Sequence, residues 1–216
     1  GFQEIFLTRL STRIVLFIMG FVFSFSFFAA NIGLAKRKKA LFTKKLFFLG
    51  GALASLFVGG FLSRQWMVVL QFLHRSTFGL SDPILGKDVA FYVFTLPFLH
   101  TLLSVCFSTI IITGIGVAIY YLQQFLKDFF TQEIDPAKKE KRVRARLSVF
   151  AQDHLMILAS FLFLLIAAKN YLAQYTIMYS KQGVVVGAGF TDVMIMLPVV
   201  KILMVLALVI AASFYL

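Results

Sequence analysis

The chain alternates between long apolar stretches and short polar segments. Several apolar runs approach the roughly 20 residues that a helix needs to cross the hydrocarbon core of a bilayer. We therefore expect an all-α fold, a polytopic integral membrane helical bundle that forms a single transmembrane domain over residues 1–216. The membrane-spanning helices are expected at residues 14–34, 46–62, 98–125, 153–172 and 193–216.

The second span and the segment after it carry two further signals. Small residues let a neighbouring helix approach closely, and this span contains Gly50, Gly51, Gly59 and Gly60. Residues 64–75 follow, and they are too few to cross the membrane. Their tryptophan and flanking arginines are typical of a helix that lies in the plane of the membrane interface, with a buried core helix as the alternative.

Residues 81–97 form the segment around which the rest of the chain is organised. Asp82 and the proline after it resemble a helix N-cap with proline at the first helical position. Asp88 is expected to cap a second short helix through Tyr92, and Pro97 to end the segment and start the third span. We therefore expect short interfacial helices on the extracytoplasmic side, packed as a rigid cap over the ends of the third and fifth spans.

The composition is typical of a membrane protein and argues against a nucleic-acid partner. Hydrophobic residues make up 60% of the chain, against about 45–50% in soluble domains. The net charge of +12 is gathered in clusters between the apolar spans, so membrane topology explains it and no nucleic-acid partner is expected. Cys106 is the only cysteine, which excludes an intramolecular disulfide framework.

The basic clusters also orient the spans. Residues 35–45 hold six lysines and arginines and residues 127–147 hold seven, whereas the other two loops hold few. Cytoplasmic loops carry an excess of such residues. We therefore expect a multi-pass protein of the cell membrane whose loops 35–45 and 127–147 are cytoplasmic and whose segment 64–97 is extracytoplasmic.

One stretch resembles a known family. The sequence Phe-Gly-Leu-Ser-Asp-Pro-Ile-Leu-Gly-Lys-Asp-Val-Ala-Phe-Tyr-Val-Phe-Thr-Leu-Pro-Phe at 78–98 is similar to the signature of the bacterial uncharacterised protein family 0182. Similar stretches occur in the family's order at 6–10, 153–155, 187–192 and 197–198. The resemblance implies a membrane region of about seven spans followed by a large extracytoplasmic domain. The chain is therefore expected to be part of a longer protein, and the resemblance supplies no activity.

Candidate site residues are few. Two interpretations apply to each candidate: it binds an ion or substrate, or it has a structural role such as helix capping. The candidates are Asp82, Lys87, Asp88, Tyr92, His100, Asp192 and Lys201. Lys201 lies inside the last span, where a charge points to function, unless Pro198 separates a surface helix from that span and leaves Lys201 at the interface. Asp153 and His154 suit the dipole at a helix start better than a proton relay. Neither a metal-ligand spacing nor a nucleophile motif is present, so no metal, cofactor or catalytic residue is predicted.

These observations favour a function that is not enzymatic. The expected role is a membrane anchor or scaffold for an extracytoplasmic domain or associated subunits. A transporter or channel-like protein that moves an ion, a lipid or a small substrate is the alternative, and a membrane enzyme is a third class. The expected partners are the lipid bilayer and other membrane subunits.

Overall fold

The computed structural model describes residues 2–35, 44–134, 149–180 and 187–215. The described chain is helical apart from its connecting turns, as expected for an all-α fold. The α-helices are α1 (Phe2–Leu34), α2 (Lys44–Arg64), α3 (Trp66–Leu73), α4 (Leu96–Ile134), α5 (Val149–Thr176) and α6 (Leu197–Ser213). Five helical stretches of the described chain are long and apolar enough to cross a membrane: Gln3–Leu34, Lys45–Arg64, Phe91–Leu126, Val149–Tyr179 and Asp192–Ser213.

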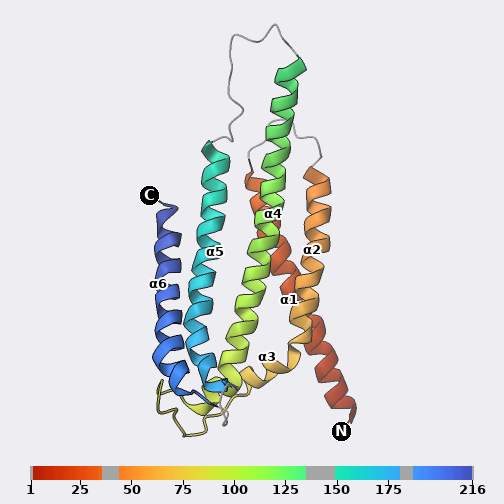
Figure 1. Ribbon diagram of the computed structural model, residues 1–216. Helices are drawn as coiled ribbons and strands as arrows, with labels where there is room; N and C mark the ends of the chain where they lie inside the picture. Colours follow the sequence, from red (N-terminus) through yellow and green to blue (C-terminus); the bar gives the residue numbers. More distant parts are fainter. Residues whose placement is uncertain (1, 36–43, 135–148, 181–186, 216) are drawn as a thin grey trace.

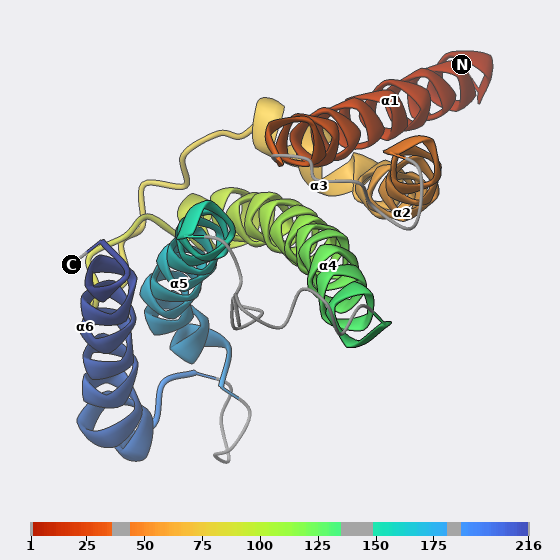
Figure 2. The same ribbon diagram turned by 90° about the horizontal axis from the view of Figure 1, so that it is seen from above.

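The five long helices run up and down in alternation, and α3 lies across one end of them (Figure 1). Seen along the helices, α1 and α2 form a pair, and α4, α5 and α6 continue from that pair as a curved row (Figure 2). Each helix packs on its neighbours in this order, and α6 packs on α5. We call the end that carries α3 and residues 74–90 the α3 end, and the opposite end the far end.

Small residues bring α1 and α2 together. Gly20 of α1 faces Gly59 of α2 so closely that a Cβ on Gly20 would lie 3.1 Å from the Gly59 Cα. One turn further along the pair, the Ser55 hydroxyl donates a hydrogen bond of 3.3 Å to the Ser24 hydroxyl, and both side chains are fully buried. The expected close approach is therefore confirmed at Gly59.

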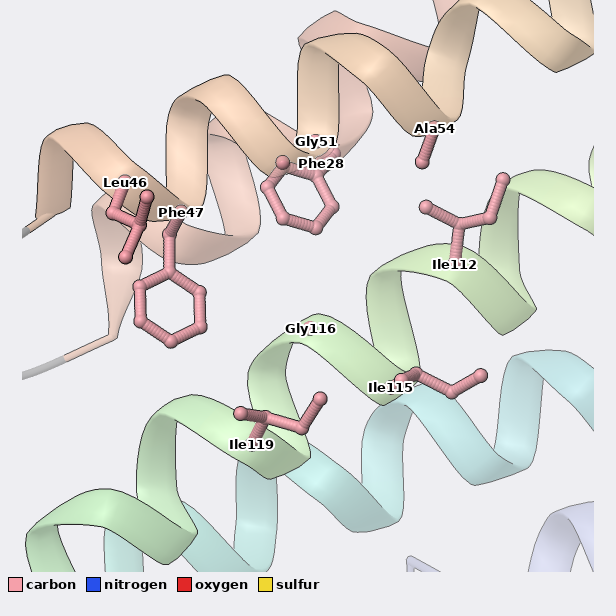
Figure 3. Close-up of a pocket in the computed structure, with 10 residues that line it drawn as sticks. Phe28, Leu46, Phe47, Gly51, Ala54, Ile112, Ile115, Gly116 and Ile119 are labelled. Carbon is pink, nitrogen blue, oxygen red and sulfur yellow. The ribbon is translucent and has the colours of Figure 1, made fainter. Parts of the chain in front are cut away.

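Phe28 fills the junction of α1, α2 and α4. Its ring lies between Gly51 of α2 and Gly116 of α4, and a Cβ on either glycine would overlap the ring. The close approach is thus confirmed at Gly51 too, whereas Gly50 and Gly60 face open space. Beside Phe28, between α2 and α4, is an apolar cavity of about 430 Å³ with Ile112 on its wall (Figure 3). Such a lining suits hydrocarbon, because it offers an occupant no polar contact.

Four helices, α1, α2, α4 and α5, are longer than the apolar runs that predicted them, whereas α6 ends at Ser213, before the end of the expected span 193–216. The structure begins α1 at Phe2 instead of residue 14, because no glycine or proline interrupts the first turns and the hydroxyls of Ser11 and Thr12 bond back to the Thr8 carbonyl. The helix α4 is also longer than predicted, because it continues to Ile134 through the first part of the expected loop 127–147. The rest of that loop, and most of loop 35–45, lies outside the described residues.

Two prolines sit inside helices instead of ending them. A π-helical stretch, Phe91–Thr95, leads directly into α4, and a second, Asp192–Met196, leads into α6. In each case a leucine and then a proline follow, Pro97 and Pro198. A π turn replaces the α-helical bonding where a proline lacks its N–H, so the helix continues. The predictions of a separate helix from Asp88 through Tyr92, and of a helix break at Pro198, are therefore wrong.

The short helix α3 lies on the surface of the described chain. None of its eight residues is buried, so the buried core alternative is wrong. The Arg9 guanidinium of α1 lies 5.4 Å from the centre of the Trp66 ring, a cation–π distance that ties α3 to α1. The direction of α3 across the long helices fits a helix that lies flat at a membrane surface.

Candidate functional site

The α3 end carries a compact turn of residues 78–90. Ser81 and Asp88 form an antiparallel bridge, and the Asp82 backbone N–H donates to the Lys87 carbonyl at 2.8 Å. The turn closes through Gly86, whose φ of 68° is in the left-handed region that side chains disfavour. The backbone of this turn is thus held by its own hydrogen bonds.

Asp82 is the buried centre of this turn, with 8% of its surface exposed. Its carboxylate accepts hydrogen bonds from the backbone N–H groups of Ile84 (3.0 Å) and Leu85 (2.6 Å) and from the Tyr92 hydroxyl (2.8 Å). Residues 83–85 form a turn and not a helix, so the predicted helix at Pro83 is wrong. The carboxylate still satisfies backbone donors as a cap does.

Asp88 holds the two ends of the segment together. Its carboxylate accepts from the backbone N–H groups of Phe78 (3.2 Å), Gly79 (3.0 Å) and Ala90 (2.7 Å). The bond to Ala90 caps the first helical turn, which continues through the π stretch into α4. Asp88 therefore has the expected capping role, but the helix that it starts is the long one.

Tyr92 connects the turn to two long helices. Pro97, five residues later, has no N–H to donate to the Tyr92 carbonyl across the π turn. The hydroxyl of Tyr179, in the 3₁₀ turn Ile177–Tyr179 that follows α5, donates to this carbonyl instead. The rings of Tyr92 and Tyr175 also meet, at 6.3 Å between centroids. The turn is thus fixed to α4 and α5, whereas the prediction placed the cap over the spans that became α4 and α6.

The remaining candidates lie apart from this centre. Lys87 is exposed, and its Nζ lies 5.8 Å from the centre of the Phe91 ring. Asp192 is buried in the first turn of its helix and accepts from the Gly189 N–H at 3.0 Å, which is the N3-to-N-cap half of a capping box. Lys201 is exposed on α6. His100 lines a polar pocket between α4 and α5.

Hydrogen bonds set the electrostatics of the two aspartates. Burial raises the pKa of Asp82, but the bonds from Ile84, Leu85 and Tyr92 outweigh it and hold this pKa below the usual aspartate value. The backbone bond from Ala90, aided by those from Phe78 and Gly79, lowers the pKa of Asp88. Both groups are therefore carboxylates at neutral pH, and the turn's own donors occupy them. Within the described residues, no group of three His, Cys, Asp or Glu side chains could hold a metal ion.

A second polar cluster, near the far end, joins three helices. His154 of α5 is buried, its Nδ1 lies 3.0 Å from the Tyr121 hydroxyl of α4, and its Nε2 lies 3.0 Å from Asn31 Oδ1 of α1. Asn31 donates its own amide N–H to the Phe27 carbonyl, so its oxygen is the acceptor for His154 Nε2–H. Nδ1 then accepts from Tyr121. The sequence pattern around Asp153 and His154 predicts only a helix start, although Asn31 inside an apolar span was a visible signal of a polar contact.

The fold and these clusters define the class of all-helical proteins with several helices of membrane-spanning length. The family model described as "Uncharacterised protein family (UPF0182)" matches residues 1–216, and the chain belongs to that family. No solved structure matches it.

Relatives in bacteria and an archaeon are similar over much of this chain. A UPF0182 protein of Synechococcus sp. (strain JA-3-3Ab) is 40% identical over 71% of the chain and 17% of its own length. Those of Methanospirillum hungatei JF-1 and Clostridium perfringens (strain SM101 / Type A) are 32% and 34% identical, over 100% and 94% of the chain. The chain spans 25% and 23% of the length of these two relatives, so it matches one segment of each.

Asp82→Asn is expected to lower the free energy of unfolding by about 1–3 kcal/mol, the cost of an unsatisfied buried polar group. Both carboxylate oxygens accept hydrogen bonds, so an amide N–H₂ would face a donor. Asparagine is therefore not the mild substitute that a simple cap would allow. Thermal unfolding of the full-length protein in detergent measures the change, with the exposed Asp153 changed to Asn as the control. Equal stability of Asp82→Asn and wild type would contradict the assignment.

The same measurement has a pH dependence. Because the pKa of Asp82 is lower in the folded than in the unfolded protein, its ionised carboxylate contributes fully to the free energy of unfolding above the unfolded aspartate pKa of about 3.9. It is lost as the pH falls through the folded value. The stability difference between wild type and Asp82→Asn should therefore stay constant near neutral pH and shrink in acid.

Proposed function

We propose that this chain is the integral membrane region of a larger protein of the cell membrane, and that it anchors and positions the rest of that protein or its associated subunits. The observation that carries the proposal is the self-bonded turn 78–90, fixed to the ends of α4 and α5 through Tyr92 and Tyr179. It gives the bundle a rigid surface at the α3 end. The greater length of the relatives supports the proposal, because most of each one lies outside the matched segment.

The basic clusters support a direction for this region. Leu34 of α1, Lys44 of α2, Ile134 of α4 and Val149 of α5 are the helix ends at the far end, and in the sequence these ends border or belong to the basic segments 35–45 and 127–147. We therefore propose that the far end is cytoplasmic and the α3 end extracytoplasmic. In that orientation α3 rests at the extracytoplasmic interface with Trp66 at headgroup level. The turn 78–90 then faces the extracytoplasmic space.

This orientation predicts which residues an impermeant reagent reaches. Single cysteines at Lys87 and at Lys139 are introduced into the full-length protein with Cys106 changed to Ser. A membrane-impermeant maleimide applied to intact cells should label position 87. Position 139 should be labelled only after permeabilisation, because it belongs to the basic segment 127–147. Labelling of position 139 in intact cells would reverse the orientation.

The anchor role predicts that unrelated spans can substitute. In a chimera, an unrelated membrane region of the same topology replaces the matched region of the full-length protein. The remainder should stay folded by limited proteolysis, stay attached to membranes, and restore the growth of a deletion strain under a condition in which loss of the wild type impairs it. If the remainder is intact and attached but growth is not restored, the membrane region itself is active and the anchor proposal fails.

One observation favours transport as a second candidate function. Four buried side-chain atoms of the described residues have no hydrogen-bond partner, and all four belong to α4: His100 Nε2, Thr109 Oγ1, Thr113 Oγ1 and Tyr120 OH. Unpaired polar groups are costly in an apolar interior, so water or a polar substrate would stabilise them. His100 lies about 180° around the helix from Thr109, at 100° per residue, so these atoms do not form one continuous stripe.

A further inference from the structure

The polar pocket between α4 and α5 is the strongest unassigned feature of the described chain. It has a volume of about 220 Å³, and its polar lining consists of His100, Ser104 and Ser108 of α4 and Lys169 of α5. Both serines and Lys169 are exposed, so the pocket opens at the surface of the helix pair. Three apolar side chains complete the wall, and no carboxylate lines it.

Two nitrogen groups line this pocket. His100 Nε2 is buried and has no hydrogen-bond partner. The second group is the amine of Lys169, and no acidic side chain lines the pocket beside it. The Ser104 hydroxyl donates to the His100 carbonyl at 2.8 Å, which still leaves its oxygen as an acceptor. A buried imidazole nitrogen without a partner is costly unless a polar ligand or water completes it, and the lysine beside it offers such a ligand a charged contact.

The depth of the pocket indicates where a ligand would come from. Lys169 lies ten residues before Tyr179, the end of its helical stretch, or about 15 Å at 1.5 Å per residue. His100 lies nine residues after Phe91, or about 13 Å by the same rise. The pocket is therefore in the half of the bundle next to the α3 end. A long lysine side chain at this depth reaches towards the headgroup layer.

We propose that this pocket binds a phosphate group, the chemistry shared by a phospholipid headgroup and free phosphate. The Lys169 ammonium donates charge-assisted hydrogen bonds to the phosphate oxygens, and the His100 imidazole adds an uncharged contact. The pocket's opening on the lateral surface lets a lipid headgroup enter with its acyl chains still in the bilayer. This inference is independent of the anchor function, since an anchor needs no ligand.

Lys201 offers a matched control for the charge. The Ser160 hydroxyl donates to the Ala211 carbonyl at 2.9 Å and sets the antiparallel register of α5 and α6. That register places Lys201 nearly level with Lys169 along the bundle. Lys201 is exposed on α6 and does not line the pocket. Lys201→Gln therefore removes the same charge at the same depth without touching the proposed site.

The test measures thermal stabilisation of the delipidated full-length protein in detergent by three added probes. Phosphatidylglycerol carries the phosphate on a lipid, diacylglycerol has the acyl chains without it, and inorganic phosphate lacks the chains. We expect phosphatidylglycerol to raise the Tm of wild type and of Lys201→Gln, and diacylglycerol not to. Lys169→Gln should weaken the apparent affinity about tenfold, since one charge-assisted contact is lost, while Lys169→Arg retains most of it.

The three probes distinguish a lipid ligand from free phosphate, and they show which results would overturn the proposal. A shift with phosphatidylglycerol alone identifies a lipid ligand, whereas a Lys169-dependent shift with inorganic phosphate identifies the free anion. The proposal is overturned if diacylglycerol stabilises as well as phosphatidylglycerol, if Lys201→Gln loses as much affinity as Lys169→Gln, or if no probe distinguishes wild type from Lys169→Gln. The Tm without added probe shows whether each variant folds. We expect Lys169→Gln to fold, because Lys169 is exposed.

Discussion

Gly59→Ala is expected to lower the free energy of unfolding by about 1–3 kcal/mol, the usual cost of overpacking a close-packed contact. The added Cβ would lie 2.7 Å from the Phe17 carbonyl oxygen, which belongs to the α1 backbone. A backbone atom cannot rotate away, so α1 and α2 must move apart and lose the Gly20 and Ser24 contacts. Reversible unfolding of the full-length protein in mixed micelles measures the loss.

The neighbouring glycine is the matched control. A Cβ on Gly60 would meet nothing within 4 Å, so Gly60→Ala should be neutral or stabilise by up to about 1 kcal/mol through helix propensity. Gly51→Ala and Gly50→Ala form a second pair with the same contrast, because only Gly51 faces the Phe28 ring. Phe28 cannot retreat from Gly51 without meeting Gly116 on its other side. Equal effects of Gly59→Ala and Gly60→Ala would show that α1 and α2 do not pack through Gly59.

His154→Phe is expected to destabilise the protein by about 2 kcal/mol. The substitution keeps an aromatic ring of similar shape, but it leaves the Asn31 amide oxygen and the Tyr121 hydroxyl without their partner. An unsatisfied buried group costs about 1–3 kcal/mol, whereas a hydrogen bond between membrane helices contributes about 0.6 kcal/mol on average. The expected loss for the two groups together therefore lies between these limits. Loss of the bonds also frees α1 from α5, since Asn31 and His154 join the two helices directly.

A double-mutant cycle isolates this cluster. Asn31→Leu together with His154→Phe replaces both partners by apolar groups, so the double variant should lose less stability than the two single variants added together. The control is His74→Phe, since His74 is exposed and its Nδ1 bonds only within α3, to the Leu70 carbonyl. Additive effects of Asn31→Leu and His154→Phe would contradict the contact. Nitrogen NMR of His154 should find the proton on Nε2.

The length and apolarity of the sequence runs determined the helices, because the backbone bonds of an apolar helix are satisfied within it whatever packs outside. Five such helices were predictable, although their ends were not: hydropathy detects the apolar middle, and polar turns such as Ser11–Thr12 continue a helix without an apolar signal. The hydrogen bonds of Asp82 and Asp88 to the backbone were also readable, since these partners all lie within ten residues, whereas the bond from the Tyr92 hydroxyl to Asp82 was not predicted. The proline rule failed at Pro97 and Pro198, where π turns keep the helix continuous.

Tertiary structure alone decided which residues meet across helices. Four glycines in one span looked equivalent, yet only Gly51 and Gly59 face a neighbour, because the rotation of α2 against α1 and α4 selects them. Tyr179 meets the Tyr92 carbonyl, and His154 meets Asn31 across 123 positions of sequence. Such pairs depend on the register and order of the packed helices, and hydrophobic periodicity carries no information on either once every face of a helix is apolar.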